Sequence, residues 1–193
     1  MIARITRLAA IAAFAALSAC AAITLAPAGA YVVGDSAVTL DRNWSDASAA
    51  VIGRSKKVRL LTIDGPLLNR LYLTEGLVEG DYLVRPAQRE GDTPIYRTDM
   101  SITEQVEFVA DSVTALGYQR VETAGVRPVD IQGQRGVRFD IEAQTAEGLN
   151  VRGLGQAFKR GDALYVAIYV APTEHYYEAT LASAEQAMSS LTL

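Results

Sequence analysis

The chain has 193 residues, a formal net charge of −4 at pH 7 and a single cysteine. An acidic chain lacks the basic patch that nucleic-acid binding requires, so we expect no nucleic-acid partner. One cysteine excludes an internal disulfide, and half of the residues are hydrophobic, which is enough for one domain with its own core.

The start of the chain has the features of an export signal. Arg4 and Arg7 make it positively charged, and the run from Leu8 to Leu17 is uncharged and apolar. A charged start, a short apolar run and small residues at the cleavage point are typical of a secretory signal peptide. The run is too short for a membrane-spanning helix, which needs about 20 apolar residues.

The residues Leu17-Ser18-Ala19-Cys20 resemble the lipobox of bacterial lipoproteins. The resemblance implies transfer of a diacylglyceryl group to the Cys20 sulfur, cleavage before Cys20 and, as a rule, acylation of the new amino terminus. Ala21 follows in place of Asp, which by analogy with enterobacterial lipoprotein sorting favours the outer membrane. The alternative is an ordinary signal peptide cut near Ala19 or Ala30, with Cys20 incidental.

These features divide the chain into three parts. We expect a signal peptide at 1–19, a lipidated N-terminus and tether at 20–35, and a single α+β domain at 36–193. Residues 20–30 are uncharged and follow neither the helical nor the strand period, so we assign them to the tether. Removal of the leader takes away two arginines and no acid, which changes the formal net charge from −4 to −6.

The domain is expected to begin with strands. Residues 32–40 hold a short strand. Trp44, the only tryptophan, is expected to pack over an edge of the core, with ligand stacking as the alternative. Two apolar runs, 57–63 and 67–73, flank Asp64-Gly65-Pro66 and predict a β-hairpin.

A long loop and a helix follow the hairpin. Residues 75–98 are rich in glycine, proline and charge, and predict an irregular loop of the kind that is often functional. Ser101 and Glu104 have the spacing of a capping box, and Gly117 is expected to end the helix. Its apolar face consists of Ile102, Val106, Val109, Val113 and Leu116. We expect Glu104, Glu107 and Asp111 to be solvated, with a cation site as the alternative.

The second half of the chain predicts strands in hairpins and a final helix. The expected strands cover 119–123, 136–145, 149–158 and 163–171. Gly153 and Gly155 indicate a bulge or close approach of the backbone. Residues 163–171 are apolar on both faces, so we place this strand in the centre of the sheet. Thr173 is expected to cap a helix whose buried stripe is Tyr177, Leu181, Ala184, Met188 and Leu191.

The pattern Gly161-Asp162-Ala163-Leu164-Tyr165, the strand end Tyr169-Val170-Ala171-Pro172 and the amphipathic helix after it resemble PsbP-type α+β domains. The resemblance implies an antiparallel sheet, here of about six strands, with an internal helix and a C-terminal helix packed on its two sides. It covers about residues 36–193 in layout and carries no catalytic residues; such domains mostly act as assembly or accessory factors. The alternative is a helix-grip domain, with a ligand cavity between a curved sheet and one long helix.

Few residues suggest chemistry. His175 is the only histidine and could pair with Glu178 at helical spacing, but a zinc site takes three or four protein ligands. A catalytic serine needs a base and an orienting group, and the chain has no Gly-x-Ser-x-Gly elbow. Four carboxylates leave a glycosidase pair open, because spacing does not show which of them meet; they are Asp64, Asp99, Asp140 and Glu142. We expect no catalytic residue, metal site or cofactor, and one modified residue, Cys20.

The sequence therefore predicts a lipid-anchored cell-envelope lipoprotein that faces the periplasm. Its domain is expected to be a non-catalytic binding or assembly module, with the membrane and an envelope protein as partners. The competing hypothesis is a carrier of an apolar small ligand in a cavity between the sheet and the C-terminal helix. An acid–base enzyme is a more distant third.

Overall fold

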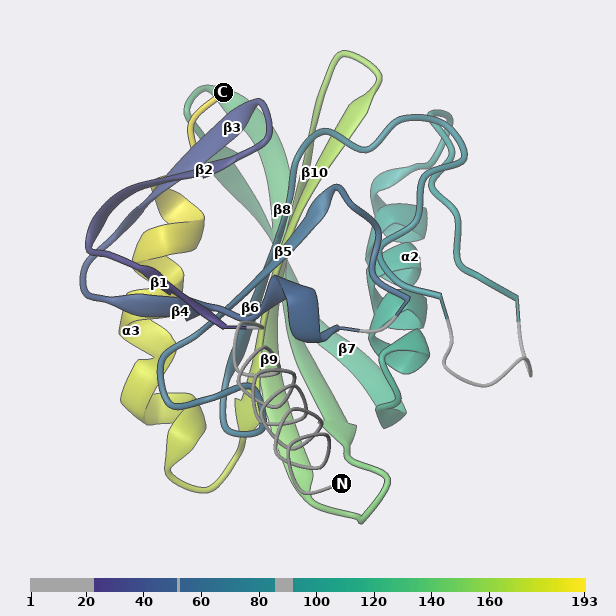
Figure 1. Cartoon of the computed structure of the whole chain (residues 1–193). Helices are drawn as coiled ribbons and strands as arrows, with labels where there is room; N and C mark the ends of the chain where they lie inside the picture. The colour runs from purple at the N-terminus through teal and green to yellow at the C-terminus, as the bar shows by residue number, and fades with distance from the viewer. Residues whose placement is uncertain (1–22, 52, 86–91) are drawn as a thin grey trace, which may run out of the picture.

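The computed structural model describes residues 23–51, 53–85 and 92–193, so the predicted signal peptide and Cys20 lie outside the described residues. An antiparallel sheet is covered by α2 (Ile102–Ala115) on one face and by α3 (Tyr176–Ser189) on the other (Figure 1). This confirms the α+β prediction, with one internal and one C-terminal helix. Within the described part of the chain, neither helix is long and apolar enough to span a membrane.

The main sheet has eight strands, more than the six expected, in the order β1-β4-β5-β6-β10-β9-β8-β7. The strands are β1 (Thr24–Ala26), β4 (Trp44–Asp46), β5 (Val58–Thr62), β6 (Arg70–Thr74), β7 (Gln119–Ile131), β8 (Gln134–Gln144), β9 (Asn150–Arg160) and β10 (Ala163–Pro172). A separate hairpin of β2 (Gly29–Val33) and β3 (Ser36–Leu40) lies beside α3 (Figure 1). A short 3-10 helix, η2 (Ser48–Ala50), follows β4.

Residues 24–33 are part of the fold, although the sequence assigned them to a tether. β1 pairs with β4, β2 pairs with β3, and the side chains of Ala26 and Val33 are buried. The hairpin is also tied to the end of the chain, because Ala37 and Thr192 exchange backbone hydrogen bonds of 2.9 and 2.8 Å. The boundary expected at residue 36 is therefore too late. The residues of β1 and β2 are uncharged and pair through their backbones, and the two strands are too short to show a clear hydrophobic period.

β10 lies in the middle of the sheet, as predicted, and residues 164–172 are all buried. Alternate side chains face the two helices. Leu164, Val166, Ile168 and Val170 belong to the core on the α2 side. Tyr165, Ala167, Tyr169 and Ala171 belong to the core on the α3 side. β10 therefore contributes side chains to both hydrophobic cores, one on each face of the sheet.

The two helices begin differently. At α2 the predicted capping box is present: Ser101 Oγ accepts from Glu104 N at 3.3 Å, and Glu104 Oε2 accepts from Ser101 N at 2.8 Å. Gly117 follows the helix with φ of +97°, the left-handed backbone that glycine adopts most readily. At α3 the cap position is His175, without a side-chain cap bond, so the prediction of Thr173 is wrong. Thr173 instead uses its backbone N–H on Asn150 O, at 3.0 Å.

Gly155 on β9 lies against the aromatic ring of Phe139 on the neighbouring strand β8. It pairs with Phe139 on β8, and a Cβ at residue 155 would lie 2.3 Å from a ring carbon of Phe139. At Gly153 a Cβ would lie 2.7 Å from the backbone oxygen of Tyr169. These contacts confirm the predicted close approach and show why β9 carries glycine at both positions.

The buried stripe of α3 fixes this helix on the sheet. Tyr177, Ala184, Met188 and Leu191 are buried as expected, whereas Leu181 is only partly buried. Met188→Ala should lower the free energy of unfolding by about 2–5 kcal/mol, because Met188 is fully buried. Urea unfolding of the purified protein measures the change.

Gln186→Ala is the matched control, since Gln186 is exposed on the same helix and a surface change costs within about 0.5 kcal/mol. Similar small losses for the two variants would contradict the docking of α3 on the sheet.

Candidate functional site

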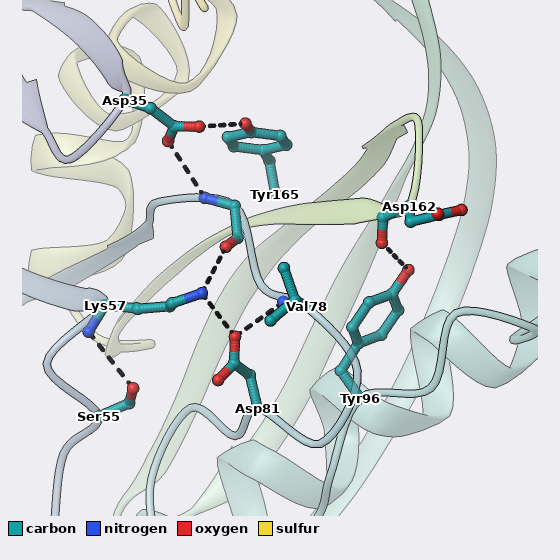
Figure 2. A network of polar contacts seen from close by, with 9 residues as sticks. Asp35, Ser55, Lys57, Val78, Asp81, Tyr96, Asp162 and Tyr165 are labelled. Atoms are coloured by element: carbon teal, nitrogen blue, oxygen red, sulfur yellow. Dashed lines mark hydrogen bonds and ion pairs between the residues drawn. The ribbon is translucent and has the colours of Figure 1, made fainter.

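A polar network joins the residue before β5 to the loop that follows β6 (Figure 2). Lys57 Nζ donates to Gly76 O at 3.0 Å and to Asp81 Oδ2 at 2.7 Å. The same Asp81 oxygen accepts from Val78 N at 2.7 Å. One lysine thus closes the first turn of the loop against β5.

Asp35 extends the network to the β2–β3 hairpin and to β10 (Figure 2). Its Oδ1 accepts from Gly76 N at 3.3 Å, and its Oδ2 accepts from Tyr165 OH at 2.7 Å. A Cβ at Gly76 would lie 2.9 Å from the Tyr165 hydroxyl oxygen, so a side chain there would disturb this contact. The carboxylate of Asp35 therefore holds three segments together.

Backbone bonds anchor the rest of the loop. Leu77 and Leu164 exchange hydrogen bonds of 2.8 and 2.9 Å, and Tyr96 N donates to Asp81 O at 2.7 Å. Tyr96 OH donates to Asp162 O at 3.0 Å, in the turn before β10 (Figure 2). The described parts of the predicted long loop are thus bonded to one end of the β9–β10 hairpin.

The surroundings of Asp35 and Tyr165 move their pKa values apart and set their protonation at neutral pH. Burial, the hydrogen bond to Asp35 and the charge of Asp35 raise the pKa of Tyr165 to about 12. Burial raises the pKa of Asp35, but the bonds from Tyr165 and Gly76 and the charge of Lys57 outweigh it and leave that pKa below its usual value. At neutral pH the tyrosine keeps its proton and the aspartate is ionised. Tyr165 is therefore a poor base, Asp35 a poor acid, and the pair acts as a structural clamp.

An open cavity of about 570 Å³ adjoins the end of the loop, between the start of α2 and strands β7, β8 and β9. Its walls include the apolar side chains of Ile102, Val137 and Ala157, and Ile102 is 60% exposed. Its polar lining groups are Gln105, Asp130, Arg135 and Lys159. Lys159 Nζ donates to Thr98 O at 2.6 Å, so the anchoring of the loop also shapes this cavity.

The residues weighed as metal ligands do not form a site. Glu178 accepts from Arg152 Nη1 at 2.8 Å, and the ring of His175 packs edge-on against Tyr176 at 5.1 Å. Among the described residues, no three His, Cys, Asp or Glu side chains are grouped to hold a metal ion. The acidic row of α2 therefore gains no support as a cation site; its Glu104 bonds to Arg97 at 3.0 Å.

The four carboxylates considered for a glycosidase come from three segments: Asp64 follows β5, Asp99 precedes α2, and Asp140 and Glu142 both lie on β8. Asp64 accepts from Asn69 Nδ2 at 2.7 Å, Asp99 lies 3.4 Å from Arg97, and Asp140 lies 3.0 Å from Arg127. Glu142 lies opposite Arg152 in the β8–β9 register. Each carboxylate is thus placed beside its own neighbour.

Trp44 is 1% exposed within the core on the α3 side. The packing prediction is confirmed, and stacking on a ligand is excluded for a side chain so deeply buried. Its indole N–H finds no acceptor in the described part of the chain.

The sequence did not identify as a site the five side chains of the network, which are Asp35, Lys57, Asp81, Tyr96 and Tyr165. Asp35 meets Gly76 across 41 positions and Tyr165 across 130 positions of the chain. The loop itself was predicted from its glycines and charges, but no local pattern connects it to Lys57, Asp35 or Tyr165.

No protein-family model matches the chain, and no curated protein matches it in sequence. Solved structures do resemble it. The solution structure of cyanobacterial PsbP (CyanoP) from Synechocystis sp. PCC 6803 is 13% identical, with 90% of this chain and 93% of that chain covered and a TM-score of 0.55. A mutant of protein Mog1 is 10% identical, with 88% and 95% covered and a TM-score of 0.51. At these identities the likeness shows the fold alone: the chain has a PsbP-like α+β domain.

Tyr165→Phe tests the clamp, because it removes the hydroxyl and keeps the ring that stacks on Phe158 at 5.2 Å. A hydrogen bond to a charged group contributes about 1.5–3 kcal/mol, and solvent around Asp35 reduces this, so we expect a loss near 1 kcal/mol at pH 7. The lowered pKa of Asp35 adds stability above the unfolded pKa of about 3.9, and this is lost as the pH falls.

Urea melts at neutral pH and near pH 3 should therefore show the difference between variant and wild type shrinking in acid. Tyr82→Phe, at a half-buried tyrosine outside the network, is the control. A difference that stays constant between the two pH values would contradict the ionised clamp.

Proposed function

We propose that the chain is a lipid-anchored cell-envelope lipoprotein, facing the periplasm, whose folded domain is a non-catalytic binding and assembly module. The observation that carries the binding role is the open cavity of about 570 Å³ beside a network whose polar groups bond to one another. The network fixes the shape of this end of the molecule. The cavity offers an apolar surface with both charge signs at its lining, which suits an envelope protein partner.

The lipobox-like segment supports the anchor. Only residues 21–23 separate Cys20 from the first residue of β1. The four steps from Cys20 to Thr24 span at most about 14 Å, so an acylated Cys20 would hold this edge of the sheet near the bilayer surface. Leu25 is 67% exposed and Ile23 is 47% exposed. These apolar side chains beside the anchor are suited to contact with lipid. Ala21 in place of Asp supports the outer membrane as the location.

The alternative function, carriage of an apolar small ligand, is better supported on the α2 side of the sheet than under α3. It assumed a cavity under the C-terminal helix, but the cavities of about 570, 340 and 270 Å³ are lined by α2, its flanking residues and the sheet face beneath them. A small ligand is therefore better accommodated on the α2 side.

Cys20→Ala should release the protein from membranes, because the sulfur that takes the diacylglyceryl group is lost. Fractionation of lysed cells and detergent phase separation measure this, with Ala22→Ser as the control that keeps the cysteine. A variant that still partitions with detergent like the wild type would refute the lipid anchor.

Ile102→Asp should reduce capture of an envelope partner, since it places a charge at the mouth of the large cavity. The fold should be kept, because Ile102 is exposed and acids are favoured in the first turn of a helix. Chemical crosslinking in intact cells, followed by purification, detects the partner. Leu149→Asp is the control, at a 45% exposed residue outside the cavity lining. Equal capture by both variants would rule out this cavity as the partner site.

A further inference from the structure

A second cavity, of about 340 Å³, lies at the opposite end of α2 from the first. Its walls include apolar side chains from three segments: Val51 directly after η2, Leu60 on β5 and Leu116 directly after α2. Leu67, which also lines it, is 83% exposed. The polar side chains of its lining are Arg70, Tyr72 and Arg85, and no acidic residue is among them.

Arg70 is a half-buried cation that has no carboxylate partner among the residues the structure describes. Its Nε donates to Pro66 O, and its guanidinium carbon lies 5.7 Å from the ring centre of Tyr118. None of the ion pairs among the described residues includes Arg70. Burial lowers the pKa of Arg70, but the effect of Tyr72 and Tyr118 is larger and in the opposite direction. The net result is a raised pKa, so the side chain stays charged.

The end of α2 explains how this charge is tolerated. The C-terminus of a helix carries about half a unit of negative charge, which stabilises a nearby cation only in part. Lys57, another partly buried basic side chain, pairs with Asp81. Two others, Arg54 and Arg138, resemble Arg70 in forming no ion pair among the described residues, but each donates to several oxygen atoms of the protein. Arg85 adds a second cation to the same cavity, with its guanidinium carbon 4.7 Å from the Tyr82 ring centre. The cavity therefore keeps an excess of positive charge.

We infer that this cavity binds a small amphiphile with one carboxylate head and an apolar tail, such as a medium-chain fatty acid. The carboxylate lies between Arg70 and Arg85, and the tail lies along Val51, Leu60 and Leu116. The planar guanidinium of arginine suits a carboxylate, which can accept two parallel N–H bonds. The volume is within the range of about 300–1,000 Å³ typical of ligand pockets. This inference goes beyond the proposed function and needs neither the lipid anchor nor the protein partner.

Three probes separate the two halves of the ligand. Calorimetric titration of the full chain with octanoate should show saturable binding. Octanol has the tail without the charge, and acetate has the charge without the tail; each should bind at least about tenfold more weakly, a change of about 1.4 kcal/mol in binding free energy. Equal affinity for octanol would refute the role of the arginines, and equal affinity for acetate would refute the role of the apolar walls.

Variants locate the site. Leu67→Glu places a carboxylate beside Arg70 at an exposed position, so it should abolish octanoate binding and leave the thermal midpoint unchanged. Arg85→Gln and Arg70→Gln should each weaken binding about tenfold or more. Leu149→Glu, outside the cavity, should bind octanoate like the wild type. Since Arg70 is partly buried and its loss can unfold the chain, Leu67→Glu and Arg85→Gln decide the outcome. Wild-type affinity in both variants would overturn the inference.

Discussion

The burial of β10 on both faces is the constraint on which the rest of the fold depends. A strand that is apolar on both sides must be covered twice, and α2 and α3 provide the two covers. On the α3 side, the strand alternates tyrosine with alanine. Tyr169 OH lies 2.6 Å from Thr180 Oγ1 and donates to Tyr177 O at 3.0 Å, which fixes the position of α3 along the strand. On the α2 side, the aliphatic residues of β10 make apolar contacts, which are not directional as hydrogen bonds are.

The two faces of the sheet are consequently closed to different degrees. The C-terminal end of α3 is held by Gln156, whose Nε2 donates to Met188 O at 2.9 Å, and by Arg138, whose Nη2 donates to Ser189 Oγ at 3.0 Å. α2 lies over the sheet with a cavity of about 570 Å³ at its start and one of about 340 Å³ at its end. Both of these cavities therefore lie on the α2 face, where the core beneath the helix is apolar.

Local patterns in the sequence were sufficient for the elements whose causes are local. The capping box at Ser101, the C′ glycine at 117 and the two-faced apolar run of β10 were each predicted and confirmed. β1 and β2 were missed because their strands depend on pairing with partners, not on a period of their own. The candidate site was harder still. The bonds of Asp35 and the position of Arg70 in a cavity without acidic lining residues depend on distant residues brought together, and no spacing along the chain expresses them.

The order of the strands relates the proposed anchor to the two cavities. β1 is one edge of the sheet and β7 is the other, and seven intervals of about 4.8 Å separate the edges by about 34 Å. An anchor directly before β1 would place that edge at the bilayer. The larger cavity is lined by β7, β8 and β9, so it would lie far from the membrane and open to a protein partner. The cavity of about 340 Å³, which holds Arg70 and Arg85, is lined by residues of β5 and β6, on the half of the sheet nearer to β1. A fatty acid that leaves the membrane would therefore reach the cavity of Arg70 and Arg85 before it reaches the larger cavity.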